Sequence, residues 1–83
     1  MSETIKVRVL YFGATAAEVG QRSEDLELPI GSESHEAFDI VLGAHPRLAA
    51  HKLLFSVNKE YASGHEKLTS GDELAVFTAV SGG

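Results

Sequence analysis

The sequence contains no cysteine. Disulfides, thiolate metal ligands and thiol nucleophiles are therefore excluded, and no covalent cross-link can compensate for a small core. A chain of 83 residues forms one domain, which leaves no room for a separate catalytic domain. We therefore expect any chemistry of this protein to use a group other than a thiol.

Basic residues are also scarce. The chain has seven Lys and Arg against twelve Asp and Glu, which gives a formal net charge of −5. The seven basic residues are scattered and form no stripe, so nucleic-acid binding is not expected. An acidic surface suits basic protein partners, but it also keeps small proteins soluble, and the charge alone does not separate the two readings.

Long apolar runs and nucleotide-binding loops are missing as well. No stretch approaches the roughly 20 apolar residues that cross a bilayer, and residues 1–4 lack the basic start and apolar run of a signal peptide. Gly13 and Gly20 match neither a P-loop nor the GxGxxG pattern. We expect a cytoplasmic protein with no membrane partner and no nucleotide site of its own.

Apolar residues that alternate with polar ones predict strands. Ile5, Val7 and Val9 alternate with Lys6 and Arg8, which is typical of a strand with one buried face. Similar reasoning predicts strands over residues 5–12, 26–30 and 53–57, a short strand over 60–62 and a last strand over 74–77.

One main helix is predicted between the second and third strands. Phe38, Val41, Leu42 and His45 follow the i, i+3, i+4, i+7 spacing of one helix face, and Pro46 ends the pattern. Ser32 or Ser34 is expected to cap the start of this helix. A shorter helix is expected over residues 14–19, with Gly20 as its C-cap.

The last strand has a continuous apolar run, Leu74–Phe77. Such a run is typical of a strand buried on both faces in the middle of a sheet, so it should pair with the first strand. The order β-β-α-β-β, with one helix covering a mixed sheet, predicts an α+β fold.

The residues after the last strand are mostly small, and the sequence ends on Gly82-Gly83. We expect one domain over residues 1–77 followed by a flexible tail over residues 78–83. Two final glycines arise by chance in roughly half a percent of sequences, at a usage of about 7% each. A terminal carboxylate without neighbouring side chains can enter a narrow channel of a partner and can form an acyl adenylate.

Three segments together resemble a known family. They are Val9–Gly13 with Ala17, Glu18 and Gly20 after it, Leu68–Phe77, and Val80–Gly83. Over nearly its whole length the chain resembles the MoaD/ThiS family of ubiquitin-like sulfur carriers, and most closely the small sulfur-carrier subunits of molybdopterin synthases. The resemblance implies a β-grasp, ubiquitin-like fold with a flexible Gly-Gly tail.

The resemblance also implies a mechanism. An ATP-dependent activating enzyme would adenylate the Gly83 carboxylate and convert it to a thiocarboxylate, so the nucleotide site and the ATP belong to that partner. The large synthase subunit, in a heterotetramer, would then receive the tail, and the sulfur would go to cyclic pyranopterin monophosphate in molybdenum cofactor biosynthesis. The chain alone would bind no cofactor and catalyse nothing. Phe77, Val80, Ser81 and Gly82 would contact the partner, although Phe77 also fits as the last core residue of its strand.

The chain departs from the family at Thr78-Ala79, where most relatives have two prolines that stiffen the exit of the tail. Two other functions therefore stay open. One is a sulfur carrier for thiamine synthesis or tRNA thiolation, and the other is a ubiquitin-like protein modifier joined to lysines through Gly83.

The four histidines, which are His35, His45, His51 and His65, do not show the spacing of a metal pair on one helix. His45 is expected to be a partly buried packing residue. We expect turn chemistry at Asp72 and no metal site.

Overall fold

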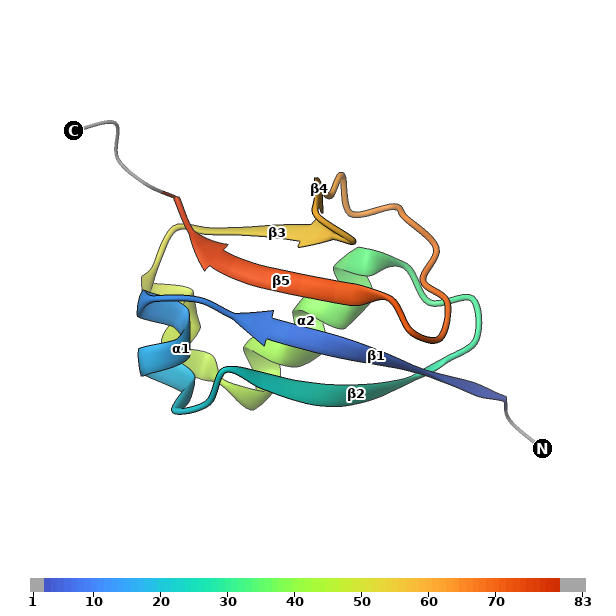
Figure 1. Ribbon diagram of the computed structural model, residues 1–83, viewed down its shortest axis with the longest axis horizontal. Coiled ribbons are helices and arrows are strands. Elements are labelled where there is room, and N and C mark those ends of the chain that lie inside the picture. Colours follow the sequence, from blue (N-terminus) through green and yellow to red (C-terminus); the bar gives the residue numbers. More distant parts are fainter. Residues whose placement is uncertain (1–2, 80–83) are drawn as a thin grey trace.

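A mixed five-stranded sheet forms the centre of this protein (Figure 1). The structure is a computed structural model that describes residues 3–79. The strand order is β2-β1-β5-β3-β4. The strands are β1 (Thr4–Tyr11), β2 (Ser23–Pro29), β3 (Leu53–Val57), β4 (Glu60–Tyr61) and β5 (Glu73–Thr78). The helices are α1 (Ala14–Val19), α2 (Ser34–Ala44) and the 3-10 helix η1 (Pro46–Ala50). The α+β prediction is confirmed, and the short strand predicted over residues 60–62 is β4.

The first and last strands pair in the centre of the sheet, as predicted. β1 and β5 run parallel, with Val9 opposite Leu74 and Tyr11 opposite Val76. β2 and β3 flank this pair in antiparallel orientation. β1 pairs with β5 as far as Val76, and β3 pairs with it as far as Thr78, so β3 directs the backbone where β5 leaves the sheet.

The core lies between the sheet and α2, which covers one face (Figure 1). Side chains with no exposed surface reach this layer from both central strands, and Val41 of α2 and Leu48 of η1 close it from the other side. Phe38 of α2 stacks on Phe55 of β3 with ring centroids 4.5 Å apart. The opposite face of the sheet carries no helix among residues 3–79. Within the same range no helix has the length and apolar character needed to cross a membrane.

The start of α2 differs from the prediction. Glu33 is the N-cap: its N–H donates to Glu36 Oε1 at 3.0 Å, and its carbonyl accepts from the Glu36 N–H at 3.0 Å. Ser34 is already the first helical residue, and its hydroxyl donates to Glu66 Oε1 at 2.6 Å. Ser32 donates to Pro29 O at 2.7 Å. Both serines are therefore engaged elsewhere, and neither caps the helix.

Two predicted helix ends are confirmed. Gly20 adopts a left-handed conformation (φ 86°) after α1, and its N–H donates to Ala16 O at 2.8 Å. The main helix ends at Ala44, and Pro46 begins η1.

The end of β5 lies one residue later than predicted. Thr78 pairs with Leu53 of β3, and the Ala79 N–H donates to Lys52 O at 2.9 Å. Thr78, which we assigned to a tail over residues 78–83, therefore belongs to the sheet. The apolar pattern stops at Phe77, but the strand continues because β3 offers backbone partners beyond that point.

Candidate functional site

The C-terminal end of β5 is where the predicted site residues begin. Ala79 is the last described residue and directly follows β5. The C-terminal end of β5 lies at the same end of the sheet as α1 (Figure 1). Four of the predicted site residues, Val80, Ser81, Gly82 and Gly83, lie outside the described residues, and their roles stay predictions. Phe77 is the predicted site residue that the structure places.

Phe77 points away from the core. Its neighbours in β5, Leu74 and Val76, are fully buried beneath α2, and the alternation of a strand places Phe77 on the other face. It is half-buried there, opposite Leu54 of β3, and its ring centroid lies 6.0 Å from that of Tyr61. Phe77 is therefore not the last residue of the helix-covered core, which was one of its two predicted roles.

Phe77 belongs to an apolar area on the face without helices. Ala75, two residues before Phe77 in β5, lies on the same face and opposite Leu10 of β1. On this face Leu54 is 39% exposed and Tyr61 is 77% exposed. We call Leu10, Leu54, Tyr61, Ala75 and Phe77 the open-face patch. Exposed apolar side chains that gather on one face next to the chain end are typical of a protein-binding surface.

Thr15 of α1 hydrogen-bonds to the backbone near the C-terminal end of β5. The Thr15 side chain is fully buried, and its hydroxyl lies 2.8 Å from Val76 O and accepts from the Phe12 N–H at 2.9 Å. β1 ends at Tyr11, opposite Val76, so β5 loses its parallel partner at this point. Because β1 does not extend beyond Tyr11, the Thr15 hydroxyl donates the hydrogen bond that the buried Val76 carbonyl would otherwise lack.

A buried hydrogen-bonded cluster braces the same end of the sheet. The Tyr11 hydroxyl donates to Glu24 Oε2, and His45 Nε2 lies 2.6 Å from the same oxygen. The Tyr11 and His45 rings meet edge to face with centroids 5.9 Å apart. These contacts join β1, β2 and the end of α2. The His45 side chain is 22% exposed, which confirms the prediction that it is a partly buried packing residue.

The cluster shifts the ionisation of two members. Burial, followed by the neighbouring Glu24 carboxylate, raises the pKa of Tyr11 well above its usual range. Burial works to raise the pKa of Glu24 as well, but hydrogen bonds from Tyr11 and His45 outweigh it and leave that pKa below its ordinary value. At neutral pH Glu24 is therefore an acceptor for both neighbours.

Asp72 has the turn role that the sequence predicted. Its carboxylate accepts from the Thr69 N–H at 2.8 Å and from Asn58 Nδ2 at 3.0 Å. Burial opposes ionisation, yet these hydrogen bonds hold the pKa of Asp72 below its ordinary value. The residue closes the turn before β5 and does not pair with another carboxylate for catalysis.

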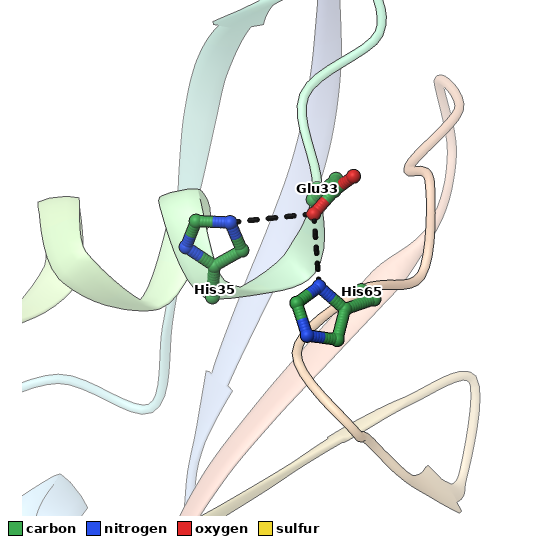
Figure 2. Close-up of side chains that lie close together, drawn as sticks. All are labelled: Glu33, His35 and His65. Carbon is green, nitrogen blue, oxygen red and sulfur yellow. Dashed lines mark hydrogen bonds and ion pairs between the residues drawn. The ribbon is translucent and has the colours of Figure 1, made fainter.

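A second group of ionisable side chains lies near the start of α2. Glu33 and His35 meet His65, which lies in the loop between β4 and β5 (Figure 2). Sequence spacing gave no sign of this group because His35 and His65 are distant in the chain. Thr15 and Glu24 were missed for a similar reason, since no local pattern marks a hydroxyl or carboxylate whose partners lie on other strands.

Comparison with known proteins agrees with this fold. A model of the family described as "ThiS family" matches residues 9–83. The chain belongs to the ThiS family. The match includes β5 and the final glycines, so the resemblance noted in the sequence is confirmed.

Several relatives carry the name molybdopterin synthase sulfur carrier subunit. The protein from Homo sapiens is 34% identical, with 94% of each chain covered. The one from Chlamydomonas reinhardtii is 30% identical over 95% of this chain and 100% of its own. The one from Mycobacterium tuberculosis is 34% identical over 95% of this chain and 99% of its own.

Solved structures show the same fold. A putative molybdopterin converting factor, subunit 1, from Pyrococcus furiosus has a TM-score of 0.84 at 27% identity, covering 92% of this chain and 99% of its own. Small archaeal modifier protein 1 of Haloferax volcanii has a TM-score of 0.82 at 26% identity, with the same coverage. A ubiquitin from Caldiarchaeum subterraneum, at 14% identity and a TM-score of 0.70, shows the fold alone. The chain therefore has the ubiquitin-like β-grasp fold.

Proposed function

We propose that this chain is the sulfur-carrier subunit of a molybdopterin synthase and that the Gly83 carboxylate carries the sulfur. The observation that supports this most is the full-length similarity to relatives named as such subunits, at 30–34% identity. The absence of cysteine agrees with it, because a thiocarboxylate provides a nucleophilic sulfur without a thiol side chain.

The proposed chemistry has three steps. A Gly83 carboxylate oxygen attacks the α-phosphate of ATP on an activating enzyme, which releases pyrophosphate and leaves an acyl adenylate. Hydrosulfide supplied by that partner system attacks the Gly83 carbonyl carbon and displaces AMP, which leaves a thiocarboxylate with sulfur in place of one oxygen. The sulfur forms a C–S bond to cyclic pyranopterin monophosphate on the large subunit as a C–O bond of that substrate breaks and its oxygen leaves. Hydrolysis of the acyl–sulfur bond then returns the Gly83 carboxylate. Two rounds supply the two sulfurs of the dithiolene.

The exit of the chain from the sheet supports delivery of its end into a partner. Ala79 is held to Lys52 by a backbone hydrogen bond, and four extended residues beyond it reach at most about 14 Å. Most of the family has proline at this position, which has no N–H to donate. Here a hydrogen bond to Lys52, the residue before β3, fixes the backbone at the exit in place of a proline ring.

The open-face patch is the proposed contact with the large subunit, in a heterotetramer. It lies on the uncovered face of the sheet and includes Phe77, directly before the exit. In this proposal Val80, Ser81 and Gly82 extend the contact into the partner. The ATP and the pterin are bound by the partners and not by this chain.

Mass spectrometry tests the proposal. We expect the full chain, incubated with an activating enzyme, ATP and a sulfur source, to gain about 16 Da as one oxygen of the terminal carboxylate is replaced by sulfur. A variant that lacks Gly83 should fold equally well and gain nothing. A free carboxylate under conditions in which a known carrier is converted would refute the carrier role.

A ubiquitin-like modifier is the second candidate, because small archaeal modifier protein 1 of H. volcanii shares the fold at 26% identity. Both functions use an adenylated Gly83, but a modifier ends in isopeptide bonds to lysine. Denaturing purification of the tagged chain from its host distinguishes them. Conjugates of higher mass that disappear without Gly83 would favour the modifier, and an unconjugated thiocarboxylate would favour the carrier.

A further inference from the structure

Two histidines and one glutamate meet at the start of α2, at the other end of the sheet from Ala79 (Figures 1 and 2). His35 Nε2 lies 3.3 Å from Glu33 Oε1, and His65 Nδ1 lies 3.2 Å from the same oxygen. The three ligand atoms all lie within 4.8 Å of one another. Figure 2 shows both rings turned toward the one carboxylate.

We propose that Glu33, His35 and His65 form a binding site for a Zn²⁺ ion. Imidazole nitrogens and carboxylate oxygens are zinc ligands, and two ligands about 2.05 Å from a tetrahedral ion lie about 3.3 Å apart. Both nitrogen–oxygen distances agree with this spacing. They are longer than the 2.7–2.9 Å of good charge-assisted hydrogen bonds. The fourth position of the ion faces solvent and takes a water molecule.

The surroundings of His35 favour an ion over a hydrogen bond. Its other ring nitrogen, Nδ1, lies 3.9 Å from Asp39 Oδ2, one turn further along α2. A neutral imidazole has one proton, and with that proton on Nδ1 it faces the Asp39 carboxylate while the Nε2 lone pair faces Glu33. A cation between Nε2 and Glu33 relieves the repulsion between these two acceptors. A carboxylate that accepts from the distal nitrogen usually orients a zinc-bound histidine, and Asp39, at 3.9 Å, reaches that position after a small side-chain movement.

The backbone holds the two halves of the site together before any ion binds. The His35 N–H donates to Gly64 O at 2.9 Å, and the Ser34 N–H donates to Glu66 O at 2.8 Å. The Glu66 carboxylate accepts from the Ser34 hydroxyl and from the Ser63 N–H. The loop that carries His65 is therefore tied to the first turn of α2, and binding an ion requires only small side-chain movements.

Charge and access also suit a cation. The chain carries a net charge of −5, and the His65 side chain is 79% exposed, so an ion can enter from solvent. With three protein ligands at an exposed site, we expect affinity in the micromolar range. A bound ion would cross-link the 63–67 loop to α2, at the other end of the sheet from the C-terminal end of β5, so this site is independent of the proposed sulfur chemistry.

Calorimetric titration with zinc sulfate tests the site. We use the full chain, freed of any affinity tag and treated with chelator, and expect one ion per chain. His65→Gln should raise the dissociation constant by about 100-fold or more, and Asp39→Asn, which changes only the carboxylate behind His35, by about 10-fold. The matched control is His51→Gln, because His51 Nε2 meets a single carboxylate, Glu18, at 3.1 Å and should not contribute.

NMR of the histidine ring nitrogens provides a second test, because these signals would not respond to zinc if the three residues had only a structural role. Zinc should change the nitrogen chemical shifts of His35 Nε2 and His65 Nδ1 and leave the chemical shifts of the His45 ring nitrogens unchanged. Absence of zinc binding at millimolar concentration would overturn the proposal. So would zinc binding of unchanged affinity in His65→Gln, or loss of binding in His51→Gln. Folding of the variants is checked by circular dichroism, and His65 lies in an exposed loop where substitution leaves the core intact.

Discussion

The two ends of the sheet use the same residue types to different effect. At the exit end, which we define as Tyr11, Thr15, Glu24 and His45, one carboxylate meets a tyrosine and a histidine that are largely buried. At the loop end, defined as Glu33, His35, His65 and Glu66, a carboxylate meets two histidines that are 49% and 79% exposed.

Burial and the number of partners make the difference. At the exit end Glu24 Oε2 already has both partners, Tyr11 and His45, and the cluster braces the strands that direct the chain end. At the loop end the contacts around Glu33 are longer and open to solvent, so the same chemistry can accept an ion. A satisfied buried cluster stabilises a fold, whereas an exposed one with open coordination can bind a ligand.

The largest expected effect is at Thr15. Thr15→Val keeps the shape of the side chain but removes the partner of two backbone groups, Val76 O and the Phe12 N–H. We expect a loss of up to about 3 kcal/mol in the free energy of unfolding, measured by urea denaturation. Thr15→Ser keeps the hydroxyl and should recover most of this loss. Equal losses in both variants would mean that packing, and not the hydrogen bonds, holds β5 here.

The next effect is at Glu24. Glu24→Ala leaves the buried Tyr11 hydroxyl and His45 without their shared acceptor, and we expect a loss of about 2 kcal/mol by the same measurement. The control is Asp25→Ala, whose partner is an exposed Arg8 at 3.8 Å and which should cost less than about 0.5 kcal/mol. Similar losses in the two variants would break the contrast between satisfied and exposed carboxylates.

Acid should reveal the part of the loop end that does contribute to stability. Hydrogen bonds, first from the Ser34 hydroxyl and then from the Ser63 backbone, lower the pKa of Glu66 from 4.5 to about 2. A lowered pKa in the folded state means that the stabilisation is present above pH 4.5 and is lost as the pH falls toward 2. The urea midpoint should fall across this window, and less steeply in Glu66→Gln. Identical slopes would show that Glu66 does not stabilise the loop.

The smallest effect is expected at His65. Without metal, His65→Gln should change the free energy of unfolding by less than about 0.5 kcal/mol, because exposed ion pairs contribute little. With zinc present, only the unsubstituted chain should gain stability. A large loss without metal would mean that the loop end is a structural cluster like the exit end, and the comparison would fail.

Local patterns were enough to predict the strands and the α+β class. Alternation at Ile5, Val7 and Val9 and the apolar run Leu74–Phe77 predicted the central pair, because burial imposes a period on neighbouring residues. Capping was harder to predict. Ser32 and Ser34 both looked suitable, but the Pro29 carbonyl and the Glu66 carboxylate engage them.

The candidate site likewise has features that local sequence pattern predicted and features that depend on tertiary contacts. Phe77 was recognised as a candidate from its place in the sequence, but the face on which it lies follows from the strand alternation relative to Leu74 and Val76, which are buried beneath α2. Thr78 looked like tail by composition, and the backbone partners on β3 placed it in the sheet. Such hydrogen bonds depend on the neighbouring strand and leave no trace in side-chain pattern.

The sequence by itself determined that this chain is a small cysteine-free α+β domain that ends on two glycines and resembles the ThiS family, since these properties depend on composition and on neighbours along the chain. Only the tertiary structure decided which distant groups meet. It placed Thr15 against Val76, Glu24 between Tyr11 and His45, and His65 beside Glu33 and His35. The physical reason is that a folded sheet brings together residues far apart in the chain, and no spacing rule specifies which of their polar groups will pair.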